Sequence, residues 1–387
     1  MIEMLKKFTV SNYRSFEKPI TIDFTKVGDY DFNEECIKDG LINKAVIYGE
    51  NAVGKTNFSK AILDVTTMIP GLTSNIVLNS VQSKLVGFLN AESEKEFAKF
   101  EYTFQIDGYE IEYIYEKSDI NNIQFESLKI DQELFYELDF STNLGNFDAF
   151  QKHPELAHLN LDVWDNKISV LKYILSHVKL QELTILRDFQ LFIGGMMTVQ
   201  ALIETHNTYY QARSSISLVI IENNLVKDFE MFLKDANINV NLKVEATLTG
   251  EEELYFDYGN KLLPFLDHAS SGTLSLTFLF ATLHLLIKPT FLFIDEFDAN
   301  FHFGVAKLML EKFKKNQNCQ TIITTHNTDL MSNKYMRPDC YLLMTPNKIT
   351  NLEDATSRIL RMGHNLENLY QAGEFNEMIN RSGDKDE

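Results

Sequence analysis

Alternating and uninterrupted apolar runs mark the first part of the chain as strand-rich. Residues 7–10 and 20–24 alternate between apolar and polar positions, which is typical of strands with one buried face. Residues 44–48 contain the uninterrupted run Ala-Val-Ile-Tyr, which indicates a strand buried on both faces. A glycine loop follows, and the apolar spacing over 55–68 predicts a helix.

The middle of the chain changes from strand-like to helix-like periodicity. Between 96 and 140, short alternating segments are separated by turn residues such as Asp107-Gly108, which predicts an antiparallel meander. Residues 165–203 and 225–236 carry apolar side chains at spacings of three and four, so we expect a mainly helical region there.

After residue 261 the pattern becomes helix, strand, helix, strand. The four segments cover 272–287, 291–295, 305–315 and 321–325. Strands that alternate with helices of this length are typical of an α/β sheet.

Composition places the chain among globular proteins and argues against two kinds of partner. Its 387 residues, 44% of them hydrophobic, suggest two or three domains. The formal charge of -19 repels phosphate backbones and anionic membranes, so sequence-blind nucleic-acid binding is disfavoured. Residues 91–140 hold 14 acidic residues and 4 Lys, which indicates either a solvated strand surface or a docking site for a basic partner.

Cysteine content and hydropathy point to the cytoplasm. Cys36, Cys319 and Cys340 form no close pair, which argues against a disulfide framework and a zinc site and favours a reducing compartment. No apolar run of signal-peptide length follows Met1, and the most apolar segment, 274–287, is interrupted by Thr and His. We expect no membrane-spanning segment.

Residues 49–56, Gly-Glu-Asn-Ala-Val-Gly-Lys-Thr, match G-x-x-x-x-G-K-[ST] between a predicted strand and a predicted helix. Gly49 and Gly54 permit a loop whose N–H groups point at phosphate oxygens. Lys55 is expected to reach the β- and γ-phosphates of ATP, and the Thr56 hydroxyl to bind Mg²⁺. The alternative is a glycine turn that only links strand to helix.

Two carboxylates follow the apolar run at 291–294. The carboxyl end of a strand in an α/β sheet is where ligands bind, so Asp295 is expected to hold Mg²⁺. Glu296 is then placed to orient and deprotonate the attacking water. The alternative is a solvated turn at a strand end.

Two further segments could contact a γ-phosphate. Ser270, Ser271 and Gly272 open the apolar helix and either simply cap it or receive the phosphate of a nucleotide held by a second copy. His326 ends the strand at 321–325 and would reach the same sheet edge as Asp295, so we favour a phosphate contact over a core role.

These motifs, in this order, resemble the ABC-type ATPase heads of SMC proteins, of the RecF repair protein and most closely of the overcoming-lysogenization-defect (OLD) family. Asp298 and Asn300 follow the acids as in the D-loop of those heads. Asn51 and Asn57 fit the OLD branch, which often has Asn within and just after its phosphate loop.

Both ends of the chain extend the resemblance, which covers residues 4–65 and 261–375. Residues 8–16 look like the first strands of such heads, where a basic residue such as Arg14 lies near the nucleotide. Residues 361–375 are similar to the ends of short single-head relatives in abortive-infection and anti-phage systems, of the AbiL and RloA type.

The sequence departs from the family pattern in three places. Only 61 residues follow His326, too few for the Toprim nuclease of the OLD family, so we expect no nuclease in this chain. The short Ser-Ser-Gly-Thr at 270–273 replaces the longer transporter signature. The glutamine that senses Mg²⁺ in the superfamily has no evident position, with Gln105, Gln124 and Glu126 as candidates.

The resemblance implies an α/β, ABC/SMC-type P-loop ATPase head with an antiparallel β lobe and a helical insertion. The expected divisions are a discontinuous core at 1–65 and 261–362, a β lobe at 66–164, a mainly helical insertion at 165–260, and a C-terminal helix and tail at 363–387.

The implied function is an ATP hydrolase with Mg²⁺ as cofactor, working as a homodimer or larger homo-oligomer. Each ATP would lie between Lys55 of one head and Ser271 and Gly272 of another, and pairing would regulate a separate effector, by resemblance a nuclease, in anti-phage defence. A RecF-like DNA-repair ATPase and a non-hydrolysing nucleotide-gated scaffold remain as alternatives.

Overall fold

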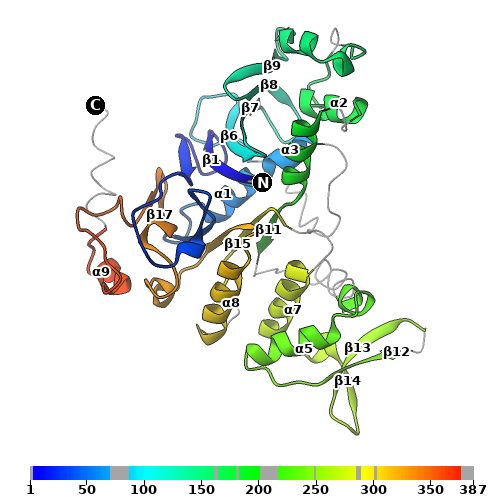
Figure 1. The fold of residues 1–387 in the computed structure, drawn as a ribbon, viewed down its shortest axis with the longest axis vertical. Helices are drawn as coiled ribbons and strands as arrows, with labels where there is room; N and C mark the ends of the chain where they lie inside the picture. Colours follow the sequence, from blue (N-terminus) through cyan, green and yellow to red (C-terminus); the bar gives the residue numbers. More distant parts are fainter. Residues whose placement is uncertain are drawn as a thin grey trace.

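Two large sheets organise the computed structural model, which describes residues 3–69, 87–160, 164–179, 183–200, 217–247, 250–284, 289–299 and 303–375. The first is a six-stranded sheet and the second a seven-stranded antiparallel sheet. Figure 1 shows the antiparallel sheet above the six-stranded sheet, with α7 (Ser271–His284) and α8 (Phe303–Lys315) on the other side of the latter.

The six-stranded sheet has the order β11-β15-β16-β5-β17-β18, and all neighbours run parallel except β18. Its middle strands are buried along their whole length, which explains their continuous apolar runs. The strands are β5 (Lys44–Tyr48), β11 (Met196–Gln200), β15 (Phe291–Asp295), β16 (Gln320–Thr324), β17 (Tyr341–Thr345) and β18 (Lys348–Asn351).

The seven-stranded sheet joins the N-terminal strands to the meander, in the order β10-β9-β8-β7-β6-β1-β2. Burial alternates along its central strands because only one face packs on the core. The strands are β1 (Glu3–Ser11), β2 (Ile20–Asp23), β6 (Ala98–Ile106), β7 (Tyr109–Lys117), β8 (Ile123–Ile130), β9 (Glu133–Asp139) and β10 (Leu144–Asn146).

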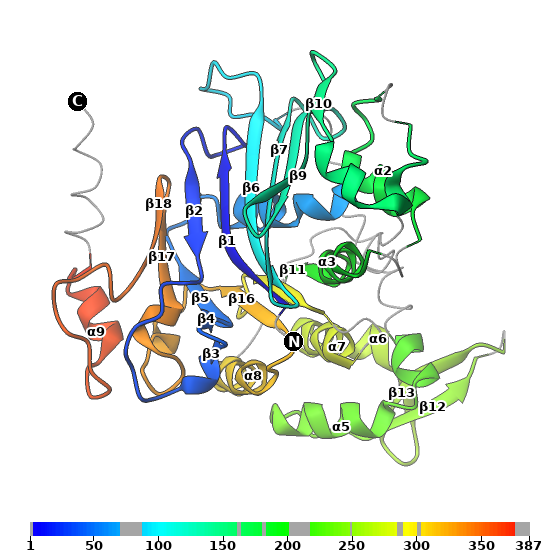
Figure 2. The same cartoon turned by 45° about the horizontal axis from the view of Figure 1, so that its top comes forward.

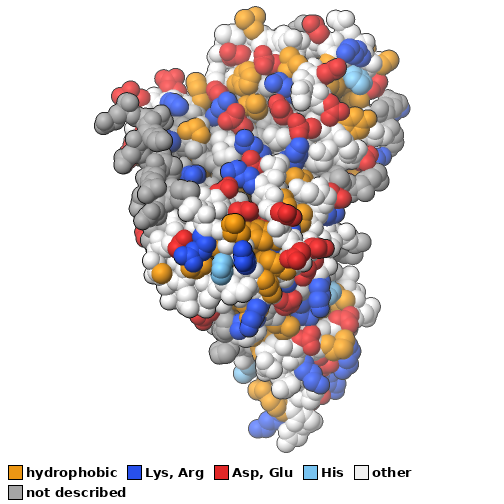
Figure 3. Space-filling view, turned by 60° about the vertical axis from the view of Figure 1, so that its left-hand side comes forward, with side chains coloured by type: hydrophobic (Ala, Val, Ile, Leu, Met, Phe, Trp, Pro, Cys, Tyr) orange, Lys and Arg blue, Asp and Glu red, His pale blue; other side chains and the backbone are white. Residues whose placement is uncertain are grey.

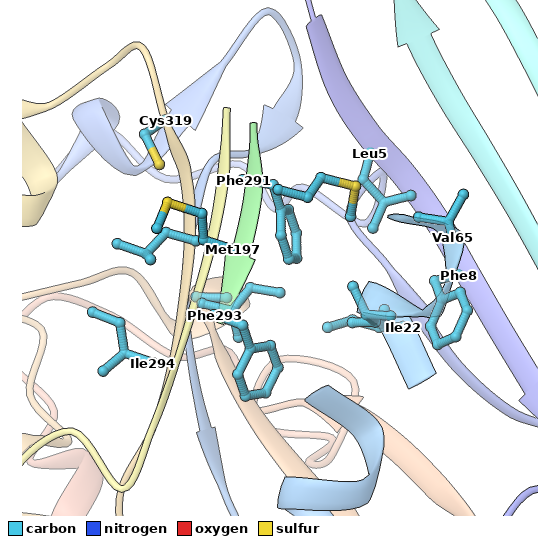
Figure 4. Close-up of a cluster of buried hydrophobic side chains, with 14 of the residues drawn as sticks. Leu5, Phe8, Ile22, Val65, Met197, Phe291, Phe293, Ile294 and Cys319 are labelled. Atoms are coloured by element: carbon cyan, nitrogen blue, oxygen red, sulfur yellow. The ribbon is translucent and has the colours of Figure 1, made fainter. Parts of the chain in front are cut away.

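Helix α1 (Lys55–Ile62) and the 3₁₀ turn Leu63–Met68 lie between the two sheets (Figure 2). The Phe58 ring lies 5.5 Å from that of Phe8 and 6.1 Å from that of Phe16. Figure 4 shows the core from the side, with Phe291 and Phe293 of β15 pointing toward the antiparallel sheet and Ile294 pointing away from it. This apolar layer fixes the helix that follows the glycine loop.

The remaining elements cover the sheets or extend from them. A small sheet, β12 (Leu242–Ala246), β13 (Glu252–Asp257) and β14 (Leu262–Pro264), leads through α6 (Phe265–His268) into α7. The other elements are β3 (Ile37–Lys38), β4 (Leu41–Ile42), α2 (Val170–His177), α3 (Thr184–Gly194), α5 (Val226–Asp235), α9 (Leu366–Gln371), and 3₁₀ turns at Glu34–Cys36, Asp148–Lys152, Pro154–Leu156, Thr328–Leu330 and Pro338–Cys340. Across the described ranges, no helix combines the length and apolar character that crossing a bilayer requires.

The region expected to be mainly helical contains strands that the sequence pattern did not reveal. β11 pairs along its length with β15, so a strand from the 165–260 segment belongs to the six-stranded sheet. Its five residues directly follow the apolar positions of α3, and a short apolar run cannot be distinguished from a helical turn by periodicity. The sheet therefore does not stop at the expected boundary of residue 261.

Candidate active site

The glycine loop between β5 and α1 adopts a conformation that its sequence requires. Gly54 has φ 103°, and a Cβ atom there would lie 2.6 Å from the Ser15 hydroxyl oxygen and 2.8 Å from the Phe16 ring. At Gly49 a Cβ atom would lie 2.7 Å from the Met344 carbonyl oxygen. Helix α1 then begins at Lys55 without a side-chain cap in the described structure, so its first N–H groups are directed toward the loop.

Lys55 is held within the loop. Its Nζ donates hydrogen bonds of 2.8 Å to the carbonyl of Gly49 and 2.9 Å to that of Glu50. Burial lowers the pKa of Lys55, while the carboxylates of Asp295 and Glu296 act in the opposite direction. The ammonium group is thus placed at the mouth of the loop with two carboxylates nearby.

The loop and the late acidic strand meet directly, although 239 positions separate them. The Thr56 hydroxyl donates a 2.5 Å hydrogen bond to Oδ2 of Asp295, whose side chain is buried. Oδ1 of the same carboxylate accepts a 2.7 Å bond from the Thr324 hydroxyl. Hydroxyl and carboxylate oxygens side by side are a donor set suited to Mg²⁺.

Thr324 is a site residue that the sequence analysis missed. Besides binding Asp295, its hydroxyl oxygen accepts a 2.8 Å bond from the backbone N–H of Glu296, and its carbonyl accepts from the N–H of Phe297. Glu296 is held at φ 51°, a left-handed conformation that costs a non-glycine residue about 1–3 kcal/mol. A hydroxyl directly after the apolar pair Ile322-Ile323 was the available signal.

His326 and Asp298 lie beyond the ends of β16 and β15. Asp298 accepts a 2.6 Å hydrogen bond from the Thr325 hydroxyl, which ties the two strand ends together. Partial burial and the positive charge of Lys55 lower the pKa of His326, against the opposing pull of nearby carboxylates. Asn300, expected to act with Asp298, lies outside the described residues.

The N-terminal turn supports the loop from the other side. Asn57 donates a 3.0 Å hydrogen bond to the Ser15 hydroxyl, next to the position where Gly54 approaches the same residue. Arg14, at φ 49°, donates from Nε to the Tyr13 hydroxyl. Asn51 is exposed in the loop. The expected nucleotide contacts of these residues stay predictions.

The residues at the start of α7 are accessible, and one of them caps the helix. The Ser270 hydroxyl accepts a 3.1 Å bond from the N–H of Thr273, as an N-cap does. Ser270 and Ser271 are exposed, and Gly272 is partly buried. Helix capping explains the presence of Ser270 but not that of Ser271 or Gly272. The contact of these residues with a second copy stays a prediction.

The three candidates for the magnesium-sensing residue lie on the antiparallel sheet. Gln105 is on β6 and Gln124 on β8. Glu126 is buried and accepts hydrogen bonds from Tyr113, Tyr136 and the first N–H groups of α2, so it is committed to holding that helix. Burial raises its pKa.

A different glutamine ends the strand beside β15. Gln200 ends β11, and its Cα lies opposite that of Asp295 in the parallel pairing of β11 with β15. The sequence analysis missed Gln200 because residues 196–200 read as helix. Only the pairing of β11 with β15 reveals its position.

Comparison with known proteins identifies the family. The family model described as "AAA domain, putative AbiEii toxin, Type IV TA system" matches residues 44–332, about three quarters of the chain. No curated protein matches in sequence.

Among solved structures, an SMC head bound to the C-winged helix domain of ScpA has 15% identity and a TM-score of 0.49, covering 91% of this chain and 99% of that one. The SMC head domain from Thermotoga maritima has 15% identity and a TM-score of 0.43, covering 90% and 98%. The Pyrococcus furiosus SMC head bound to the C-terminal domain of ScpA has 14% identity and a TM-score of 0.45, covering 92% and 98%.

The expected α/β class with an antiparallel β lobe is confirmed: a largely parallel six-stranded sheet lies beside a seven-stranded antiparallel sheet. The glycine loop at the end of β5 and the acids at the end of β15 lie at one edge of the six-stranded sheet. On the match over residues 44–332, the chain belongs to the AAA domain family whose description names a putative AbiEii toxin.

Proposed function

We propose that this protein binds ATP together with Mg²⁺ and hydrolyses the γ-phosphate bond, and that nucleotide-dependent pairing of two heads regulates a partner effector. The observation that carries the proposal is the 2.5 Å contact between Thr56 and Asp295 beside Lys55. It joins a phosphate-binding loop to a carboxylate at the edge where α/β sheets bind ligands.

The residues of the loop fit a nucleotide triphosphate. The N–H groups at the start of α1 and the close backbone approach at Gly54 suit phosphate oxygens. Lys55 would exchange its two carbonyl acceptors for phosphate oxygens, and Thr56 and Asp295 would hold Mg²⁺. When bound, Mg²⁺ neutralises the charge that develops on the phosphate oxygens.

Glu296 is proposed as the base that orients water and accepts its proton. The bond from its N–H to Thr324 fixes its backbone and therefore the direction in which its carboxylate leaves the strand. His326, with its lowered pKa, is neutral at pH 7, so it offers a hydrogen bond without adding charge.

The second half of each site is proposed to come from another copy. Ser270, Ser271 and Gly272 present an accessible helix start to which a phosphate could bind in trans. Asp298 and Asn300 follow the acids and are proposed to lie at the pairing surface. ATP binding would then favour a dimer or larger assembly, and hydrolysis would release it.

The proposed setting is bacterial anti-phage or abortive-infection defence, in the cytoplasm. The family description supports it by naming a putative AbiEii toxin and a Type IV TA system. The three buried free thiols support a reducing compartment. The effector is proposed to be a separate nuclease, on the resemblance to OLD-type ATPases, and copurification with the product of the neighbouring gene would test this.

The central test compares Lys55→Ala and Glu296→Gln with wild type. Lys55→Ala should lose binding of a fluorescent ATP analogue because the phosphate charge is no longer matched. Glu296→Gln should bind the analogue, hydrolyse ATP on the order of 10²–10⁴-fold more slowly, and accumulate as a dimer or larger assembly. Binding is measured by fluorescence titration, turnover by phosphate release, and assembly by light scattering.

Matched controls are Lys348→Ala and Glu252→Gln, which change exposed residues on β18 and β13. Both should bind and hydrolyse ATP as wild type does. Unchanged turnover in Glu296→Gln would refute the hydrolase, and wild type that binds without turnover would indicate a nucleotide-gated scaffold.

A further inference from the structure

The outer face of the seven-stranded sheet carries part of the acidic excess at 91–140, including Glu101, Glu112 and Glu116. Along β6 and β7 the side chains alternate between the core and this outer face. Cross-strand pairing aligns Glu116 with Phe125 and Asp139, and Ile114 with Ser127 and Glu137. Figure 3 shows acidic, basic and hydrophobic side chains intermixed over the end of the molecule where this sheet lies.

This face is hollowed, and the hollow has an apolar floor. A concavity of about 510 Å³ lies over β6, β7, β8 and β9, a volume that accommodates a few side chains of a ligand. Phe97, Ile114 and Phe125 line it and are each only partly buried. Three apolar side chains gathered in one hollow can hold an apolar side chain of a bound segment.

The rim of the hollow carries three acidic side chains and two lysines, and both lysines pair with acids outside the lining. Glu116, Glu137 and Asp139 line it, and no described Lys or Arg lies within ion-pair distance of Glu116 or Glu137. The two lysines at the hollow are already paired. Lys99 lies 2.8 Å from Glu101, and Lys129 lies 3.6 Å from Glu112.

The negative charge of the rim determines which class of molecule can bind in the hollow. Nucleic acid and anionic lipid would be repelled by these carboxylates. A second copy that docked through the same face would bring another acidic rim against this one. A segment that combines cationic side chains with an apolar one matches both the rim and the floor.

We propose that the hollow on the outer face of β6–β9 docks a basic, apolar-anchored segment of a partner protein. The proposal rests on the proposed function only in that a partner exists. Strand β7, which carries part of this site, also contacts the segment that follows α1. Lys117, which follows Glu116 on β7, faces the opposite side of the sheet and binds Asp64, just beyond helix α1.

The test uses three short fluorescein-labelled peptides and fluorescence anisotropy. One alternates arginine with leucine, the second has serine in place of leucine, and the third has glutamate in place of arginine. The first should bind most tightly, its binding should weaken as salt is raised above about 0.15 M, and the third should not bind.

Variants locate the binding to this face. Glu116→Lys with Glu137→Lys should weaken binding of the arginine–leucine peptide about tenfold, while Glu251→Lys with Glu252→Lys, an equal charge change on the small sheet, should leave it nearly unchanged. Glu137→Lys alone replaces an exposed residue, so this single variant can be measured in place of the double variant if the double variant does not fold. Ile114→Thr should weaken the leucine peptide about threefold and leave the serine peptide unaffected.

Three outcomes would overturn the proposal: equal weakening by the control pair, no weakening by either face variant, or self-association of wild type through this face in place of peptide binding. Lys55→Ala separates this proposal from the proposed function. Normal peptide binding by that variant, together with no ATP turnover in wild type, would refute the ATPase and retain the docking site.

Discussion

Lys44 is a charged residue in a strand that is otherwise apolar and fully buried. It opens β5 and its side chain is buried. Its Nζ donates to the carbonyls of Asn316 and Cys319 and lies 3.5 Å from the Thr321 hydroxyl. Burial lowers the pKa of Lys44 to about 8, while the neighbouring Cys319 acts in the opposite direction.

This shift predicts a pH dependence of stability. Below pH 8 Lys44 is protonated in both folded and unfolded chains, so the cost of its burial is constant. Between about 8 and the ordinary lysine pKa of about 10.4, the folded state releases the proton first, so stability rises with pH. Urea unfolding at about pH 7 and about pH 9.5 should show wild type gaining about 1–3 kcal/mol relative to Lys44→Met. Parallel profiles would contradict the shifted pKa.

At the scale of elements, a buried polar network joins β7 to the segment that follows α1. Lys117 exposes 1% of its side chain and Asp64 7%, and Lys117 Nζ lies 2.9 and 3.1 Å from the two carboxylate oxygens. The Tyr115 hydroxyl donates to the same carboxylate, and the Tyr102 hydroxyl donates to the carbonyl of Ala61 in α1. The antiparallel sheet thereby holds the helix that begins at Lys55.

Removing only one partner of the Lys117–Asp64 pair should lower the free energy of unfolding more than removing both partners. Lys117→Met leaves Asp64 charged and buried, so we expect a loss of about 3–5 kcal/mol. Adding Asp64→Asn removes the unpaired charge, and the double variant should be less destabilised than the sum of the two single variants. Urea unfolding of all four proteins gives the coupling energy, and additive losses would show that the two groups act independently.

Some strands could be predicted from their sequences, and others could not. The strands of the antiparallel meander were predictable because one face is buried and the other solvated, so their side chains alternate. β11 was not, because all five of its residues lie in a short run next to an apolar helix, and its identity depends on pairing with β15.

At the scale of the whole molecule, both ends of the chain contribute to one core. β1 and β2 belong to the antiparallel sheet, while β5 lies between β16 and β17 in the other. The buried Arg337–Asp339 pair binds the backbone of Gly28, which attaches the N-terminal region to the C-terminal part. A single head built in this way leaves the start of α7 accessible to another molecule.

Mixing two inactive variants tests whether sites form between copies. Lys55→Ala removes the phosphate-binding ammonium group, and Gly272→Arg should block the helix start in trans. A mixed dimer contains one site with both residues intact, and about half of the dimers in an equimolar mixture are mixed, so mixing should recover about a quarter of wild-type turnover per head. No recovery at any ratio, with dimers present by light scattering, would contradict a shared site.

The phosphate-loop motif, the acid pair and the α/β pattern could be recognised along the chain, because each depends on a local pattern or a contiguous motif. Three contacts appear only in the folded chain: the bonds of Thr324 to both acids, the Cα of Gln200 opposite that of Asp295, and the bonds from the first N–H groups of α2 to Glu126. The physical reason is that these contacts join residues far apart along the chain, whose neighbours are chosen by sheet order and packing, which no local spacing records.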